Sequence, residues 1–392
     1  MLHSSSLLSG SLYWGRRQWL QSTALAAMAL AAPLRAQEST ATHKGSSTSA
    51  ATGASAITIV QVADMSPAQQ DVSRDFLIGS RAAWQAFNTD GGLQGRPVQH
   101  LVLETDGSAA SLQAAWNKAH AMTQCVALSG CIGHAGAASL ATLQSRTALA
   151  QIAPWLRSRP ESIPDNLVFD IFPDIQAQIA HALQTMLVAG LRDVGVVYGS
   201  AALQQQSQAE ISRVTQAIQL HTHTLGHNHP DRKTPRQVVI LFIGGTPELH
   251  AFTRQLVLPS GRQCYVVALG EANLQVLAQL GGTPRNVSVI ATQTVPLITS
   301  SLPVVRAYRQ TLARLYDEPP SPLGLAGFIA ARYTANALSH INATPTRTNV
   351  LEAMRRRSDT DIGGFRVAFQ GKKRTNAFVT QTILTPDGRI VG

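Results

Sequence analysis

Polar side chains that could bind a small molecule follow several predicted strands of this 392-residue chain. Ser139 follows a glycine-rich turn at the start of a predicted helix, where free backbone N–H groups and its hydroxyl could hold a carboxylate. Asp174 and Glu271 could supply the countercharge for an ammonium group. The alternative for Ser139 and Asp174 is that each is an ordinary helix cap. As binding groups, these side chains would suit an amino acid.

The elements that must position these residues alternate between strand and helix. A nearly continuous apolar run at 57–63 is typical of a strand buried on both faces of a parallel sheet. An amphipathic helix over 68–88 and a strand over 98–104 follow. The same rhythm resumes after a proline-punctuated stretch at 154–164, which predicts a crossover between lobes. We therefore predict an α/β fold of two Rossmann-like, doubly wound lobes joined by a multi-strand hinge.

Ligands of such sheets bind beyond the carboxyl ends of the strands, where strand order reverses. Two lobes that face each other would place both sets of strand ends along one cleft. The predicted ligand-binding residues are Ala137, Ala138, Ser139, Trp155, Arg157, Asp174, Tyr198, Gly245, Thr246 and Glu271. We expect no catalytic residues, no metal and no cofactor, because the sequence has no Gly-x-Ser-x-Gly elbow, phosphate loop, Gly-x-Gly-x-x-Gly or HExxH motif.

The stretch FNTDGGLQGRPVQHLVLETD at 87–106 resembles the N-x-x-G-G-x-x-G-R signature of type I periplasmic solute-binding proteins. This branch includes the branched-chain amino-acid receptors of ABC transporters. Further similar stretches follow in the family's order: GHAGAAS at 133–139, IAP at 152–154, FPD at 172–174 and SPLGLAGFIAARYTANAL at 321–338. The glycines and Arg96 of the first stretch are interpreted as a structural corner away from the cleft.

The resemblance spans roughly 56–392 and implies a function. We expect a monomeric periplasmic receptor that binds an amino acid, an amide or a related carboxylate between its lobes. Its partners would be this small-molecule ligand and an ABC transporter membrane permease, to which the receptor delivers the ligand. The alternative is a ligand-sensing regulatory protein of the same fold without a transport role.

One loop departs from the family pattern. Where amino-acid receptors of this family offer small and hydroxyl residues, this chain has Trp155, Leu156 and Arg157. Such a pocket would suit a larger carboxylate, an aromatic acid or an amide. Trp155 could stack on the ligand or act as a hydrophobic plug.

The N-terminus is predicted to direct export. Residues 1–36 resemble a twin-arginine-type signal peptide, with Arg16 and Arg17 before an apolar run at 24–34 that is too short to span a membrane comfortably. The alternative is an uncleaved anchor. A Ser/Thr/Ala-rich tract at 37–55 predicts a disordered linker, and we expect the protein in the Gram-negative periplasm. The predicted lobes are 56–160 plus 296–345 and 161–295 plus 346–392.

The remaining features are interpreted without a special function. The formal net charge is +10, but no Lys/Arg run is interleaved with aromatic residues, so we favour solvated basic patches and expect no nucleic-acid partner. Cys125, Cys131 and Cys264 are predicted to be small buried hydrophobes. Four histidines between 221 and 229 could bind a transition metal, but their spacing fits no established zinc pattern, so we favour a solvated loop.

Overall fold

The computed structural model describes the folded part of the chain with several internal gaps. The described residues are 57–133, 138–140, 143, 149–157, 166–188, 190–226, 229–356, 358–370, 373–374 and 378–392. They belong to one compact unit, Ala54–Gly392. The predicted signal peptide at 1–36 and linker at 37–55 lie outside the described residues. Within the described part, no helix is long and apolar enough to cross a membrane.

The first sheet is parallel, with strand order β2-β1-β3-β4-β5. Its strands are β1 (Ile57–Asp64), β2 (Val98–Thr105), β3 (Cys125–Ser129), β4 (Ala150–Ile152) and β5 (Val168–Phe169). Along β1, Ile57 and Ile59 belong to the hydrophobic core on one face of the sheet, whereas Val60 and Val62 belong to the core on the other face. A strand buried on both faces needs apolar side chains at consecutive positions, which explains the run in the sequence.

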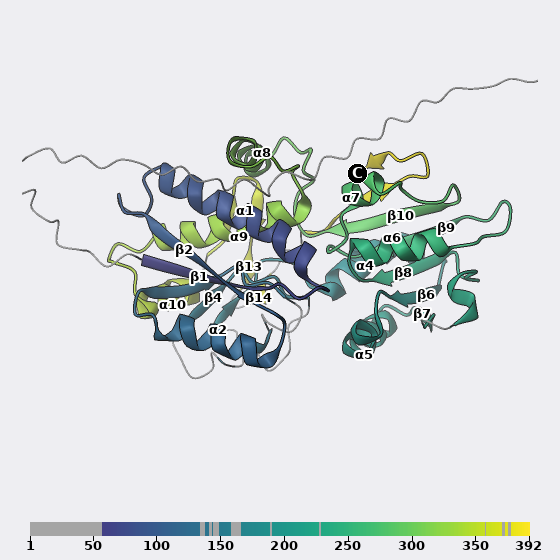
Figure 1. Cartoon of the computed structure of the whole chain (residues 1–392), viewed down its shortest axis with the longest axis horizontal. Helices are drawn as coiled ribbons and strands as arrows, with labels where there is room; N and C mark the ends of the chain where they lie inside the picture. The colour runs from purple at the N-terminus through teal and green to yellow at the C-terminus, as the bar shows by residue number, and fades with distance from the viewer. Residues whose placement is uncertain are drawn as a thin grey trace, which may run out of the picture. The chain divides into compact units, whose positions relative to one another are not determined.

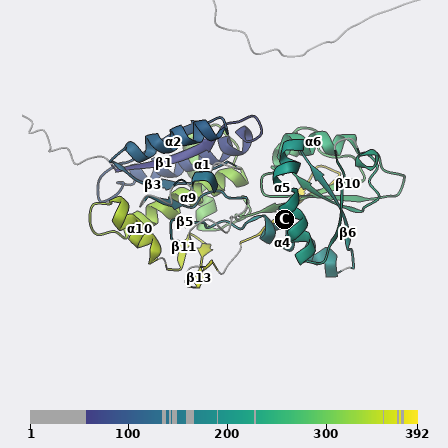
Figure 2. The same cartoon turned by 90° about the horizontal axis from the view of Figure 1, so that it is seen from below.

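Helices cover both faces of this sheet (Figures 1 and 2). One core includes residues from four helices, α1 (Gln70–Thr89), α8 (Pro303–Leu315), α9 (Pro322–Ser339) and α10 (Arg347–Arg355). The opposite core includes α2 (Ala109–Ala121). Helices α1 and α9 touch so closely that a Cβ at Gly327 would overlap the backbone oxygen of Phe76, and a Cβ at Gly79 would overlap that of Gly324.

The second sheet has the order β16-β15-β10-β9-β8-β6-β7 and is parallel from β6 to β10. Strands β15 and β16 are antiparallel to their neighbours. Its strands are β6 (Asp193–Tyr198), β7 (His221–Thr224), β8 (Val239–Ile243), β9 (Cys264–Ala268), β10 (Val287–Gln293), β15 (Thr380–Leu384) and β16 (Ile390–Val391). One face packs on α4 (Ile175–Val188) and α5 (Ala201–Ala217), the other on α6 (Thr246–Gln255) and α7 (Leu274–Gln279). Two such sheets confirm the predicted α/β class.

Two segments join a different lobe from the one expected. Strand β5 pairs with β4, so the first sheet extends past the boundary expected at residue 160. Within the expected second-lobe segment 346–392, helix α10 and the hairpin of β11 (Thr360–Ile362) and β12 (Phe365–Val367) pack on the first-lobe core instead. The reason is their apolar faces, since Val350 and Phe365 are buried there. A smaller hairpin, β13 (Phe369–Gln370) with β14 (Lys373–Arg374), follows.

The corner at 87–106 is structural, as interpreted from the sequence. The Asn88 side chain donates to the carbonyl oxygen of Val98 and accepts from its N–H, both at 2.8 Å. Gly92 has a φ of +64°, and a Cβ there would overlap the carbonyl oxygen of Arg96, so only glycine fits. These contacts tie the end of α1 to the start of β2.

Candidate functional site

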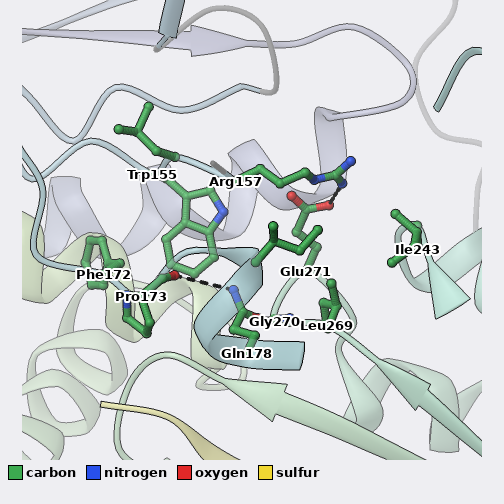
Figure 3. Close-up of a pocket in the computed structure, with 12 residues that line it drawn as sticks. Trp155, Arg157, Phe172, Pro173, Gln178, Ile243, Leu269, Gly270 and Glu271 are labelled. Atoms are coloured by element: carbon green, nitrogen blue, oxygen red, sulfur yellow. Dashed lines mark hydrogen bonds and ion pairs between the residues drawn. The ribbon is translucent and has the colours of Figure 1, made fainter. Parts of the chain in front are cut away.

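A cavity lies at the carboxyl ends of strands from both sheets, where the doubly wound fold predicts a ligand. Its first-lobe wall follows β4 and β5, and its second-lobe wall follows β8 and β9 and includes the start of α4 (Figure 3). The lining residues are Trp155, Leu156, Arg157, Phe172, Pro173, Ile175, Gln178, Ile243, Gly244, Leu269, Gly270 and Glu271. The free volume is about 20 Å³, enough for about one water molecule.

An ion pair joins the two lobes inside this cavity. Arg157 Nη2 donates to Glu271 Oε2 at 2.5 Å, and the two side chains are only 12% and 11% exposed. Figure 3 shows the guanidinium and the carboxylate meeting end to end. Arg157 Nη1 also lies 3.4 Å from the hydroxyl of Ser207 on α5. Both charges have lost most of their hydration, and the ion pair compensates for that loss. Removing either residue would leave the other as a buried charge without this partner.

Gln178 on α4 holds the loop that carries Glu271. Its side-chain oxygen accepts from the N–H of Gly270 at 2.8 Å and from the hydroxyl of Thr292 at 2.9 Å. Its amide nitrogen lies 3.4 Å from the carbonyl oxygen of Pro173, which it contacts as donor. Sequence reasoning missed this residue. The available signal was a polar side chain between Ile175 and Ile179 on the face of the helix that had to be buried.

Trp155 forms an aromatic wall of the cavity. The residue is 8% exposed, and its ring packs on Phe76 and Phe172 with centroid distances of 5.8 and 5.2 Å. Most of the indole therefore contributes to the first-lobe core, as the plug alternative requires, while part of the residue lines the cavity. Stacking on a ligand stays a prediction.

A second, larger cavity of about 340 Å³ shares Glu271 with the first. It lies between α1 of the first lobe and, in the second lobe, the N-terminal part of α6 together with α7. Two of the predicted site residues, Gly245 and Thr246, line this cavity. The hydroxyl of Thr246 accepts from the N–H of Asn273 at 2.9 Å, which ties α6 to α7 at the cavity wall.

The comparisons with known proteins agree with this geometry. Residues 56–234 match the family model described as periplasmic binding protein. The fold is that of a type I periplasmic binding protein. A substrate-binding periplasmic protein from Ralstonia solanacearum has a TM-score of 0.74 at 21% identity, over 86% of this chain and 99% of that one. The resemblance predicted from the sequence is confirmed.

Two further solved structures of this fold carry a solute class in their descriptions. The branched-chain amino acid transporter substrate-binding protein LivJ from Streptococcus pneumoniae, in complex with isoleucine, has a TM-score of 0.67 at 13% identity, over 86% of this chain and 98% of that one. A fatty acid ABC transporter substrate-binding protein from Thermomonospora curvata has a TM-score of 0.68 at 15% identity, over 86% and 90%. Among curated proteins, none matches the sequence.

The other predicted site residues lie elsewhere. The carboxylate of Asp174 accepts from a backbone N–H three residues on, at 2.9 Å, and so caps α4 as the alternative reading proposed. Tyr198 is buried in the second-lobe core, where burial raises its pKa to about 12, and the structure does not bring its ring to either cavity. Ser139 is exposed and Ala138 half-buried. Ala137 lies outside the described residues.

The cysteines and histidines lie away from both cavities. The three cysteines are buried free thiols, as predicted, and burial raises the pKa of the Cys131 thiol to about 12. His221 and His223 lie on the exposed face of β7, at 3.6 and 4.0 Å from a carboxylate oxygen of Asp193. Among the described residues there is no group of three or more side chains placed to hold a metal ion. His227 is outside the described part.

Proposed function

We propose that this protein is a receptor that binds a small organic solute between its two lobes and delivers it to an ABC permease. The observation that carries the proposal is the meeting of Arg157 and Glu271, one from each lobe, in a cavity at the carboxyl ends of both sheets. A solute that contacts both residues bridges the lobes. Its binding therefore favours the closed arrangement over any open one, because only closed lobes offer both contacts.

The chemistry of the pair favours a solute with both charges. The planar guanidinium of Arg157 matches the geometry of a carboxylate. Glu271 accepts hydrogen bonds from an ammonium group, and Gln178 restrains the loop that carries it. An amino acid inserted between the two side chains offers each of them a new group of opposite charge in place of the contact it breaks. Amides and other carboxylates are the related alternatives.

The similar structures support a carboxylate-bearing solute. One is described as a complex with isoleucine and another as a fatty acid ABC transporter substrate-binding protein, and isoleucine and fatty acids are carboxylic acids. Trp155, Gly245 and Thr246 are the further predicted contacts around the same site.

A thermal-shift screen of the purified protein against amino acids, amides and organic acids tests the proposal. A solute at a hundred times its dissociation constant stabilises the protein by about 2.7 kcal/mol, which is measurable as a higher melting temperature. Arg157→Gln should abolish the calorimetric binding signal of any solute found. The matched control is Arg309→Gln, on the exposed face of α8, which should leave the affinity unchanged.

Two results would contradict the proposal. A screen in which no solute shifts the melting temperature would remove the receptor function, and unchanged affinity in Arg157→Gln would remove the role of the ion pair. Delivery is tested separately by solute uptake into proteoliposomes that contain a candidate ABC permease, with and without the receptor. Uptake that does not depend on the receptor would favour the sensing alternative.

A further inference from the structure

The larger cavity between the lobes is acidic although the chain is basic. The whole sequence has 32 Lys and Arg residues against 22 Asp and Glu residues. Among the described residues that line this cavity, five are acidic and one is basic. The acidic residues are Asp71, Asp75, Glu248, Glu271 and Glu318, and the basic one is Arg74. The local charge is therefore opposite in sign to the net charge of the chain.

Most of this negative charge has no positive partner in the described part of the chain. Glu271 pairs with Arg157 in the adjoining cavity. Asp71, Glu248 and Glu318 form no ion pair with a described residue. The guanidinium of Arg74 lies 2.5 and 3.1 Å from the side-chain amide of Gln70.

Asp75 brings one of these carboxylates to the boundary between the lobes. It lies on α1, and the side chains of Ser321 of the first lobe and Asn273 of the second both favour its charged form. Burial raises the pKa of Asp75, so a cation placed beside it would favour its charged form.

The cavity also has an apolar side. Val276 and Leu280, at 39% and 49% exposure, are among the more exposed large hydrophobic side chains of the structure, and both line it. Val72 and Ile78 of α1 are further apolar lining residues. Its volume of about 340 Å³ lies within the range of about 300–1,000 Å³ typical of small-molecule sites. Methylene groups against this side and a cation among the carboxylates would match the lining.

We propose that the solute is a basic amino acid or a close analogue, with its side chain in the acidic cavity. The α-carboxylate and α-ammonium groups bind Arg157 and Glu271, and the methylene chain lies against the apolar side. The terminal cation lies among Asp71, Asp75 and Glu248. This inference rests on the proposed receptor function, and Glu271, which lines both cavities, is where the solute would pass from one to the other.

Calorimetry with nearly isosteric pairs of amino acids tests the charge of the solute. The pairs are L-arginine with L-citrulline and L-lysine with L-2-aminoheptanoic acid, which differ mainly in the terminal positive charge. We expect the charged member of each pair to bind at least about tenfold more tightly. Equal or tighter binding of the neutral members overturns the inference and leaves the receptor function standing. If no amino acid binds at all, the proposed function fails and the inference fails with it.

A double variant tests where the cation lies. Asp71→Asn with Glu248→Gln removes two charges but keeps side-chain shape, and neither residue belongs to a hydrophobic core. The preference for arginine over citrulline should fall by about tenfold, while the affinity for citrulline stays the same. Asp90→Asn, at the other end of α1, is the control and should change neither affinity. An unchanged preference in the double variant would refute the placement.

Discussion

Replacing Glu271 with glutamine should open the two lobes without unfolding either of them. Its carboxylate lies 2.5 Å from Arg157, and both side chains are about nine-tenths buried, so the change leaves an uncompensated guanidinium between the lobes. Removing one partner of a buried ion pair costs about 3–5 kcal/mol. Because the partners lie on different lobes, separation of the lobes returns Arg157 to water. We therefore expect the loss of the ion pair to shift the protein towards the open arrangement of the lobes. A penalty of about 3 kcal/mol lowers the ratio of closed to open molecules by roughly 100-fold.

The distance between labels on the two lobes measures this change. Gln113 on α2 and Gln208 on α5 are exposed, so cysteines introduced at these positions can be labelled, whereas the native thiols are buried. Electron-spin distance measurements should show a longer mean distance in Glu271→Gln than in the wild type, with the melting temperature little changed.

The matched control is a surface ion pair within one lobe. Arg81 and Glu104 are 4.0 Å apart and exposed, and such pairs contribute about 0–1 kcal/mol, so Glu104→Gln should leave the distance distribution unchanged. Identical distributions for the wild type and Glu271→Gln would refute the reasoning. A large drop in melting temperature without opening would show instead that the pair stabilises the fold of a lobe.

Two further predictions concern stability. Gly327→Ala should lower the free energy of unfolding by about 1–3 kcal/mol in urea titrations, because its Cβ would push α9 away from Phe76. The control is Gly226→Ala, which should be nearly neutral because a Cβ there meets no described atom within 4 Å. A similar loss of stability in both variants would contradict the packing argument. Burial lowers the pKa of His100 from 6.5 to about 4, so below pH 6.5 the unfolded chain gains a proton that the native state does not. Stability is full above pH 6.5 and falls as the pH drops towards 4, by about 2 kcal/mol at pH 5. His100→Gln, which can still donate to Gln61, should remove this part of the pH dependence, and an unchanged slope would exclude His100 as its source.

The fold could be predicted because burial on both faces of a sheet leaves a strong pattern in the sequence. The continuous apolar run of β1 fits a strand buried on both faces, and the helical spacing of Val72, Phe76 and Trp84 fits a helix with one buried face. The lobe to which an element belongs was harder to predict. Strand β5 has two residues, and the apolar face of α10 would fit the core of either lobe. That choice depends on the path of the chain in space, and local periodicity does not record it.

The site could be predicted only in part, for a reason seen at Tyr198 and Asp174. Both lie at or just after the carboxyl end of a strand, where ligands bind to such sheets. Position along the chain does not fix the direction of a side chain, because neighbouring side chains on a strand point to opposite faces. The ring of Tyr198 belongs to the core packed on α4 and α5, and the carboxylate of Asp174 caps a helix. Asp71 and Asp75 were missed because they lie on α1 at positions that suit a solvated helix face. Only the approach of the second lobe makes them part of a cavity.

The ion pair between the lobes favours a solute that carries a positive group as well as a carboxylate. A simple carboxylate that binds Arg157 must displace Glu271, and the displaced carboxylate then loses the guanidinium while it is still buried. Breaking such an ion pair costs several kcal/mol, which offsets much of the free energy gained from the new contact between the solute and Arg157. A zwitterion meets both charges, and a further cation reduces the repulsion among the carboxylates of the adjoining cavity. Each positive group on the solute therefore removes a penalty that the protein carries on its own, so solutes should rank by positive charge as well as by size.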